Sequence, residues 1–569
     1  MTEKVIQGVR KLPPCRAACP AHVNVQAYVS LIQRGKFKEA VEVIRKDMPF
    51  PAICGRVCFS PCEDACARVN VDQAVAIRAL KRLVADIEHE QGRVKGEPVP
   101  KKYSLKVAII GAGPAGLAAA YELAKLGYPV TVFERMAEPG GMMRYCIPDF
   151  RLEKFVVANE IAYIKDTGVE IKTGIEFGKD ITIESLKNDG YKAIFIAIGT
   201  QVGVKLNVPG EDLEGVINAV DFLRGLALGK PIKIGEKVAV IGGGNTAIDA
   251  ARTAKKLGAK EVIILYRRSR EEMPALPHEV DLAEKDGIKF YFLVTPKRII
   301  GENGRVKAVE CLRMRLGEPD ESGRRRPIPI SFSEHLYEVD MVIPALGQAM
   351  ETGVLPPELL NKEKGGLLYD PQTLETSIPG VFVGGDVATG PASIIEAVGA
   401  GKRAAISIHL YLSGQDLRKG RDENIEEVTW VKDWHALRKK ARRYDPPIEK
   451  PHLSFEEAGR YLEKLQRNAR FEAFRCLGCG PCAECLAGMD LCDGDKAVVD
   501  ERKCVGCNVC AAVCPVEAVK KDRRGIAVVN EDLCKGCGLC AARCPEQAIT
   551  MKKLSNEQIL AMAFETLRR

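Results

Sequence analysis

The chain has 569 residues, which is longer than a single hydrophobic core usually supports, so several domains are expected. Charged residues make up 28% and hydrophobic residues 46%, which are ordinary proportions for a globular protein. The net charge of +8 is mild, and no arginine-rich arm or basic–aromatic stretch points to nucleic acid, so an acidic protein partner is favoured. No apolar run reaches the roughly 18 residues of a membrane span, and the N-terminus lacks an apolar signal core, which predicts a cytoplasmic protein without membrane insertion.

The first 100 residues carry six cysteines within helical patterns. Apolar spacing predicts helices within residues 25–46 and 75–87. Pro61 interrupts the second cysteine group, so a looped path around a metal centre is expected there. Thiolates at this density suit iron–sulfur clusters, with zinc as the alternative. The candidate ligands are Cys15, Cys19, Cys54, Cys58, Cys62 and Cys66.

A dinucleotide-binding pattern begins at Lys106. A buried strand at 107–110 leads into Gly111-Ala-Gly113-Pro-Ala-Gly116 and then into a helix. In such a turn the glycines allow a tight bend, the approach of a pyrophosphate and close helix–strand packing, and the helix N-terminus binds the diphosphate. A second strand at 130–133 ends in Glu134, which is placed to bind a ribose hydroxyl.

The same fold continues in two later stretches. The Gly140-Gly141 turn allows close approach to a flavin ring or ribityl chain, and a strand at 193–198 ends in Gly199. A strand at 381–383 is followed by a turn with Asp386, expected to bind the ribityl or phosphate region, and by a helix from Ala392 onward. The residues expected to bind FAD are Gly111, Gly113, Pro114, Ala115, Gly116, Glu134, Arg135, Gly140, Gly141, Arg144, Gly199, Gly385 and Asp386.

A second strand–glycine–helix unit starts at Lys237, between the two parts of the first. Its next strand, at 261–265, leads to two arginines where an acid would bind the 2′-hydroxyl of NAD. Arginine there favours the 2′-phosphate of NADP(H) over NAD(H), with a solvated charged turn as the alternative. Residues 340–348 are expected to return as a strand. The residues expected to bind NAD(P)H are Gly242, Gly244, Asn245, Thr246, Arg267 and Arg268.

The C-terminal part contains the most specific signal. After a charged linker and a predicted helix at 455–474, the spacing Cys-x2-Cys-x2-Cys-x3-Cys-Pro occurs twice, as in bacterial ferredoxins with two [4Fe–4S] clusters. The fourth cysteine of each run ligates the other cluster, so one set is Cys504, Cys507, Cys510 and Cys544, and the other is Cys534, Cys537, Cys540 and Cys514. A further cluster is expected from Cys476, Cys479, Cys482, Cys485 and Cys492, with one cysteine to spare.

Several of these motifs resemble the glutamate synthase small subunit, and the first 100 residues also resemble the N-terminal iron–sulfur domain of dihydropyrimidine dehydrogenase. The similar segments are CxxxCP, CGRVCxxPCExxC, GAGPAG, PGGMMRYCIPDFRL, GGGNTAIDAA, YRRSREEMPA and GVFVGGDVATGP. The resemblance implies two N-terminal [4Fe–4S] clusters: Cys19, Cys58 and Cys62 match one, and Cys15 and Cys66 match the other, while Cys54 can complete either. Two family cysteines before Cys15 are absent, and the family's Gln or Glu ligand falls near Lys81, so at least one cluster is expected and the second stays open.

The expected fold is multidomain. An α-helical iron–sulfur domain precedes an α/β flavoprotein with an NAD(P) fold inserted into an FAD fold, and an α+β ferredoxin-like domain follows. The expected bounds are 1–100 for the iron–sulfur domain, 101–230 and 346–415 for the FAD fold, 231–345 for the NAD(P) fold, 416–470 for the linker and 471–569 for the ferredoxin-like domain.

Electron transfer is the expected function. Cys146 has no CxxC partner, so it cannot form an active-site disulfide, and both Cys146 and Cys311 are interpreted as packed thiols. Electrons are therefore expected to pass singly between flavin and clusters, in either direction, to a catalytic partner subunit or a ferredoxin. The alternatives are a glutamate synthase small subunit proper and a non-catalytic assembly subunit of an iron–sulfur complex.

Overall fold

The computed structural model describes residues 9–90, 92, 95–361, 366–421, 424–427, 443–444, 455–476, 479, 496–514, 518–530, 534 and 539–551. The chain divides into two compact units, which are described separately. The cysteine-rich unit comprises Met1–Asp47, Ser60–Val84 and Asp422–Arg569, and the dinucleotide unit comprises Met48–Phe59 and Ala85–Arg421. None of the described helices is long and apolar enough to cross a membrane.

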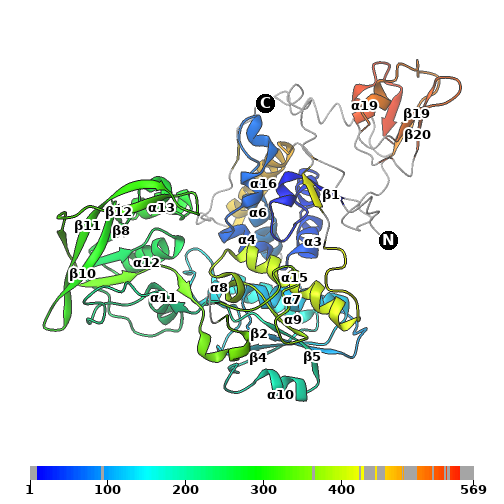
Figure 1. Cartoon of the computed structure of the whole chain (residues 1–569). Helices are drawn as coiled ribbons and strands as arrows, with labels where there is room; N and C mark the ends of the chain where they lie inside the picture. Colours follow the sequence, from blue (N-terminus) through cyan, green and yellow to red (C-terminus); the bar gives the residue numbers. More distant parts are fainter. Residues whose placement is uncertain are drawn as a thin grey trace. The chain divides into compact units, whose positions relative to one another are not determined.

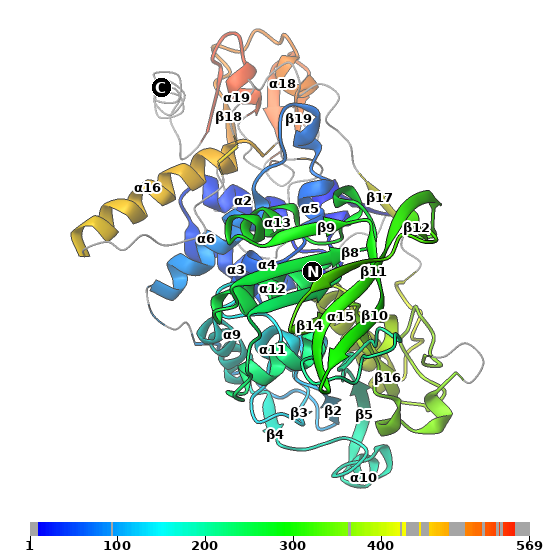
Figure 2. The ribbon, with the colours of Figure 1, turned by 90° about the vertical axis from the view of Figure 1, so that its left-hand side faces the viewer.

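The dinucleotide unit contains a five-stranded parallel sheet in the order β16-β5-β2-β3-β4. Figure 1 labels β2, β4 and β5 of this sheet, and Figure 2 labels all of its strands. Its central strands are buried on both faces because helices cover them, as expected for parallel strands. Helices α7 and α15 pack closely, since a Cβ on Gly401 would lie 2.3 Å from the carbonyl oxygen of Ala115. The strands and helices of this half are β2 (Lys106–Ile110), α7 (Pro114–Leu126), β3 (Val130–Glu134), α8 (Met142–Tyr145), α9 (Lys154–Asp166), β4 (Glu170–Thr173), α10 (Ile183–Asn188), β5 (Tyr191–Ile196), β16 (Val381–Val383), α14 (Asp386–Thr389) and α15 (Ile394–Leu412).

A second parallel sheet, in the order β14-β7-β8-β9, forms the inserted half. Helix α11 packs into the core of this half, although the sequence boundary at residue 231 assigned it to the preceding segment. An antiparallel sheet, in which β11 pairs with β10, β12 and β13, extends from it (Figure 2). The elements are α11 (Ala219–Ala227), β7 (Lys237–Ile241), α12 (Asn245–Lys256), β8 (Glu261–Tyr266), α13 (Pro277–Lys285), β9 (Lys289–Phe292), β10 (Val294–Glu302), β11 (Arg305–Pro319), β12 (Arg325–Pro329), β13 (His335–Glu338) and β14 (Met341–Pro344).

Buried ion pairs join the two halves of the dinucleotide unit. Arg151 lies between Asp249 of α12, at 2.6 Å, and Glu279 of α13, at 2.9 Å. The short strands β6 (Val202–Gly203) and β15 (Gln348–Ala349) pair where the chain passes between the halves. Helix α4 (Pro51–Val57) joins the same unit, because Glu160 of α9 accepts hydrogen bonds from the first amides of α4, at Ala52 (2.7 Å) and Ile53 (3.0 Å).

The cysteine-rich unit contains short helices and one long one. The apolar run at 25–46 forms two helices separated at Gly35. Residues Cys58 to Ser60 separate α4 from α5, which begins at Pro61, so the second cysteine group is not one continuous helix. Helix α16 has the predicted bounds and packs against α2, as Figure 2 shows. Strand β1 (Val9–Leu12) pairs with β17 (Asn424–Glu427). The helices are α1 (Pro14–Ala17), α2 (Val25–Gln33), α3 (Phe37–Asp47), α5 (Pro61–Asp64), α6 (Ile77–Glu90) and α16 (Phe455–Phe474). The boundary between the two units falls inside α6, after Val84.

The ferredoxin-like segment consists of two antiparallel strand pairs and two short helices. Strand β18 (Ala497–Val499) pairs with β21 (Ile549–Met551), and β19 (Val519–Lys521) pairs with β20 (Ala527–Val529). Helices α18 (Val509–Ala512) and α19 (Leu539–Arg543) each contain the third cysteine of a run, Cys510 and Cys540. Cysteine side chains make up much of the core of this segment.

Candidate functional site: a flavin cavity and thiol clusters

The glycine-rich turn after β2 has the geometry that a bound diphosphate requires. Gly111 has φ +104°, and a Cβ there would lie 2.5 Å from the carbonyl oxygen of Ala197. A Cβ on Gly116 would lie 2.0 Å from the carbonyl oxygen of Gly111, so α7 and the turn pack as closely as the sequence predicts. Gly113 is the N-cap of α7 and meets open space, which leaves the first amides of the helix accessible to an anion.

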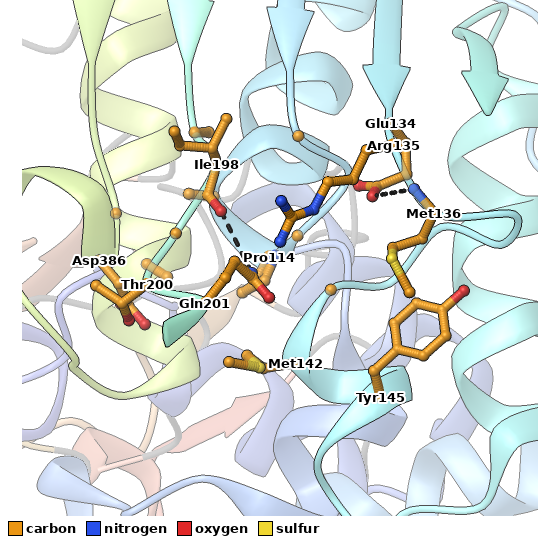
Figure 3. Close-up of a pocket in the computed structure, with 18 of the residues that line it drawn as sticks. Pro114, Glu134, Arg135, Met136, Met142, Tyr145, Ile198, Thr200, Gln201 and Asp386 are labelled. Carbon is orange, nitrogen blue, oxygen red and sulfur yellow. Dashed lines mark hydrogen bonds between the residues drawn. The ribbon is translucent and has the colours of Figure 1, made fainter. Parts of the chain in front are cut away.

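A cavity with about 1230 Å³ of space not filled by protein atoms opens in front of this turn (Figure 3). Both sequence-distant parts of the FAD half contribute to it. All the residues predicted to bind FAD line the cavity except Gly116, Gly140 and Arg144. Gly116 acts through packing, and the Arg144 side chain is engaged elsewhere, donating a 2.8 Å hydrogen bond to the carbonyl oxygen of Pro139 and pairing with Glu138.

Glu134 lies at the end of β3, at the cavity wall. Its carboxylate accepts hydrogen bonds from the amides of Ala112 (2.8 Å) and Met136 (2.9 Å), as Figure 3 shows for the second. Burial raises the pKa of Glu134, although both amides counteract it. The two hydrogen bonds fix the carboxylate at the edge of the turn and leave acceptor capacity for a ribose hydroxyl.

Asp386 lies on the other side of the cavity, beside Thr200 and Gln201 in Figure 3. It is the first residue of α14, and the amide of Ala392 bonds its carboxylate. Burial raises the pKa of Asp386 to about 6. A carboxyl group in this position can accept hydrogen bonds from ligand hydroxyls, or donate one when protonated.

Several residues of the cavity were not identified from the sequence. Arg135 pairs with Glu351 (Nη1–Oε2 2.8 Å), a residue more than 200 positions later, so no local pattern could reveal the pair. Met142 and Met143 lie within the segment PGGMMRYCIPDFRL, but the sequence assigned them no role at the site. The lining residues to which the sequence assigned no binding role include Met136, Met142, Met143, Tyr145, Ile147, Thr200, Gln201, Arg224, Glu351 and Ile394.

The donor set of this cavity fits FAD. The open helix N-terminus suits a diphosphate, the carboxylate of Glu134 suits a ribose, and the methionine, isoleucine and tyrosine side chains suit a flavin ring. A Cβ at Gly113 would project into the open space where the diphosphate is expected.

The inserted half repeats the turn at β7. A Cβ on Gly242, which has φ +144°, would lie 2.4 Å from the carbonyl oxygen of Ala345. Gly244 is the N-cap of α12, with Asn245 and Thr246 in the first turn. The Asn245 side chain accepts a 3.0 Å hydrogen bond from the amide of Leu276, so it braces the following loop.

The two arginines after β8 differ in their surroundings. Arg268 is 4% exposed and forms an ion pair with Asp320 at the end of the antiparallel sheet. Arg267 is exposed to solvent. The sequence predicts a 2′-phosphate site at both residues. In the structure, Arg267 is the one of the two that a nucleotide phosphate can reach from solvent.

The isolated cysteines are packed thiols. Cys146 is 8% exposed and Cys311 is fully buried among apolar side chains. Burial raises the pKa of both thiols to about 12. Neither is a thiolate nucleophile at neutral pH, in line with the prediction from the sequence.

The ferredoxin-like segment brings together the four thiols that the crossed spacing assigns to one cluster. Cys504, Cys507, Cys510 and Cys544 all line one cavity, with about 400 Å³ of empty space. The amide of Ala527 donates to the sulfur of Cys504 (3.5 Å), and that of Ala548 donates to the sulfur of Cys544 (3.2 Å). Such bonds stabilise the thiolate sulfurs of iron–sulfur sites.

The remaining cysteines are distributed as follows. Of the second ferredoxin set, Cys514, Cys534 and Cys540 are described, and Cys537 lies outside the described residues. Cys482, Cys485 and Cys492 also lie outside them. In the cysteine-rich unit, Cys15 and Cys66 line a cavity together with Cys476 and Cys479, which the sequence assigns to a different cluster. Cys54 and Cys58 belong to the dinucleotide unit.

Three family models match the chain. Pyridine nucleotide-disulphide oxidoreductase matches residues 105–401, more than half of the chain. Dihydropyrimidine dehydrogenase domain II, 4Fe-4S cluster, matches residues 9–93, and the 4Fe-4S dicluster domain matches residues 497–551. The three matches confirm the predicted order of an iron–sulfur domain, a two-nucleotide flavoprotein and a ferredoxin-like domain.

Curated relatives cover most of the chain. The NADP(+)-dependent formate dehydrogenase subunit beta of Moorella thermoacetica is 45% identical over 70% of this chain and 60% of its own length. The NADPH-Fe(3+) oxidoreductase subunit beta of Geobacter sulfurreducens is 42% identical over 73% of this chain and 66% of its own length. This chain therefore spans less than two thirds of either relative.

A third relative is covered almost completely. The glutamate synthase [NADPH] small chain of Azospirillum brasilense is 36% identical over 70% of this chain and 86% of its own length. The chain therefore belongs to the pyridine nucleotide-disulphide oxidoreductase family, together with the glutamate synthase small chain.

Proposed function

We propose that this protein is an electron-transfer subunit that oxidises NADPH at FAD and passes single electrons through [4Fe–4S] clusters to a partner enzyme or ferredoxin, or runs in reverse. The observation that carries the proposal is that one chain holds both an FAD-shaped cavity at a helix N-terminus and a four-thiol cavity with crossed ferredoxin spacing. Both kinds of cofactor carry electrons, so electron transfer between them accounts for their presence in one chain.

The residues of the chain hold and orient the cofactors. The amides at the start of α7 bind the FAD diphosphate, Glu134 binds a ribose hydroxyl, and Arg267 binds the 2′-phosphate of NADPH. Bound FAD would accept two electrons from reduced nicotinamide and release them one at a time. The thiolates of the ferredoxin-like segment hold the clusters and receive amide hydrogen bonds that stabilise their charge.

The lone thiol of Cys146 supports single-electron transfer. A flavoprotein that delivers electron pairs to a disulfide needs two cysteines in reach of one another. Cys146 has no cysteine neighbour in sequence, and burial keeps its pKa at about 12, so it cannot take part in dithiol exchange at neutral pH.

The names of the relatives support NADP as the nucleotide and a partner subunit. Two are beta subunits of NADP(H)-linked oxidoreductases, and one is the small chain of an NADPH-linked synthase. The proposed partner is a catalytic subunit, and the proposed location is the cytoplasm. A role as the glutamate synthase small subunit proper is the second candidate, favoured by the coverage of that relative. The match covers 70% of this chain, which also carries a 4Fe-4S dicluster domain at residues 497–551.

An anaerobic reaction tests the proposal. The full protein with its FAD and clusters is mixed with NADPH or NADH, and flavin absorbance is followed with a viologen as final acceptor. NADPH should bleach the flavin faster than NADH does and should reduce the viologen. If neither nucleotide bleaches the flavin, the role as an assembly subunit replaces the enzymatic one.

A further inference from the structure

A second four-thiol cavity lies in the cysteine-rich unit. It is lined by Cys15 of α1, by Cys66 after α5, and by the pair Cys476 and Cys479 after α16. Its empty space is about 370 Å³, close to the 400 Å³ of the cavity that the ferredoxin cysteines line. Apolar residues, including Val25, Val29 and Val75, and the polar residues Gln26 and Arg68 complete its wall. The cavity therefore has the ligand number and the size of the ferredoxin-type site.

Buried ion pairs hold the remote segment in place. Arg475, directly before Cys476, is 4% exposed and donates hydrogen bonds to Asp72 (2.8 Å) and Glu472 (2.6 Å). Arg68, two residues after Cys66, is 2% exposed and donates two hydrogen bonds to Asp72, at 2.7 and 2.6 Å. Asp72 thus joins both arginines, and Arg68 also donates to the carbonyl oxygen of Arg475 (3.2 Å).

Further contacts tie α16 to the same loop. Arg475 also donates to the carbonyl oxygens of Gln73 (2.6 Å) and Ala74 (3.2 Å), and Glu472, 1% exposed, accepts a 2.9 Å hydrogen bond from the amide of Ala76. Buried charges with this many partners define one register of α16 on the loop, because each lost partner leaves a charge unpaired away from water. Cys476 is consequently placed beside Cys66 by the protein itself.

We propose that Cys15, Cys66, Cys476 and Cys479 ligate one [4Fe–4S] cluster. The cysteine pair after α16 then completes the N-terminal domain rather than a separate cluster, and Cys482, Cys485 and Cys492 no longer form a five-cysteine set with it. A cube binds each thiolate at a different iron and so spans wider gaps than one zinc ion does.

The assignment does not depend on the proposed function, and it is tested by cluster content. The full chain is purified anaerobically as Cys15→Ala, Cys476→Ala and the double variant, and iron and labile sulfide are measured per protein. Each single variant should lose one cluster, about four irons, and the double variant should lose no more than either single one. A double variant that loses about eight irons would assign the two cysteines to separate clusters and overturn the proposal.

Ligand-retaining variants give a second readout that does not need cluster loss. Cys15→Ser and Cys476→Ser each replace sulfur by oxygen, so both should shift the same signal in the EPR spectrum of the reduced protein. Cys482→Ala is the matched control and should leave that signal unchanged. Shifts of two different signals, an unchanged spectrum in Cys476→Ser, or loss of zinc instead of iron in the alanine variants would each contradict the assignment.

Discussion

The clearest test of the cofactor preference is the substitution Arg267→Ala. Arg267 is exposed at the end of β8, whereas Arg268 is buried and paired with Asp320. A hydrogen bond to a charged group contributes about 1.5–3 kcal/mol, which corresponds to about a 10- to 150-fold change in an equilibrium or rate ratio. The ratio of kcat/KM for NADPH to that for NADH should fall by this factor in Arg267→Ala. NADH itself should be used as well as before, because it has no 2′-phosphate.

The assay is steady-state viologen reduction with each nucleotide, on protein with full FAD content. Arg268→Ala is the matched control. It should lower the free energy of unfolding, because it removes the buried guanidinium that pairs with Asp320, and it should leave the nucleotide preference in place. If Arg268→Ala abolishes the preference and Arg267→Ala preserves it, the reasoning from exposure is refuted.

Three further outcomes are expected. Gly116→Ala places a Cβ 2.0 Å from the carbonyl oxygen of Gly111, so it should destabilise the protein by about 1–3 kcal/mol and weaken FAD retention. Thermal unfolding and flavin content measure the two effects, and an unchanged Tm would contradict the expectation. Burial raises the pKa of Asp386 to about 6, so the folded apoprotein favours the protonated carboxyl group. The stability that the protonated Asp386 contributes at low pH is lost as the pH rises through about 6. Asp386→Asn should therefore stabilise the apoprotein more at pH 7 than at pH 4, by at most about 3 kcal/mol, and an equal effect at both pH values would count against the buried carboxyl. Cys146→Ser should leave NADPH-driven flavin bleaching essentially unchanged, because the thiol is buried and neutral, whereas a large loss of rate would assign it a redox role.

The local elements of this fold are predictable from the sequence because their signals are local. The strand and glycine turn before α7, the repeat of this pattern at β7 and the bounds of α16 all follow from apolar spacing and glycine positions within short windows. The crossed cysteine spacing likewise identifies the set that lines the ferredoxin cavity, since that ligand pattern is built into the repeat.

The parts that sequence reasoning missed depend on pairs of residues far apart in the chain. Arg267 and Arg268 are equivalent by sequence, and only the antiparallel sheet, which carries Asp320, distinguishes them. The proximity of Cys476 to Cys66 arises from the charges around Asp72, which carry no spacing signal. Helix α11 belongs to the core of the inserted half because its apolar face packs there, which a boundary drawn between motifs could not show.

The most direct test of the central claim compares the wild-type protein with a variant that lacks a ferredoxin cluster, Cys504→Ala/Cys544→Ala. Both cysteines line the same four-thiol cavity, and neither is among the residues that line the flavin cavity. With NADPH as donor and a small ferredoxin as acceptor, the variant should bleach its flavin as fast as the wild type but lose most of its ferredoxin reduction. Ferredoxin reduction at the wild-type rate in the variant would show that electrons leave the flavin without these clusters and would contradict the account.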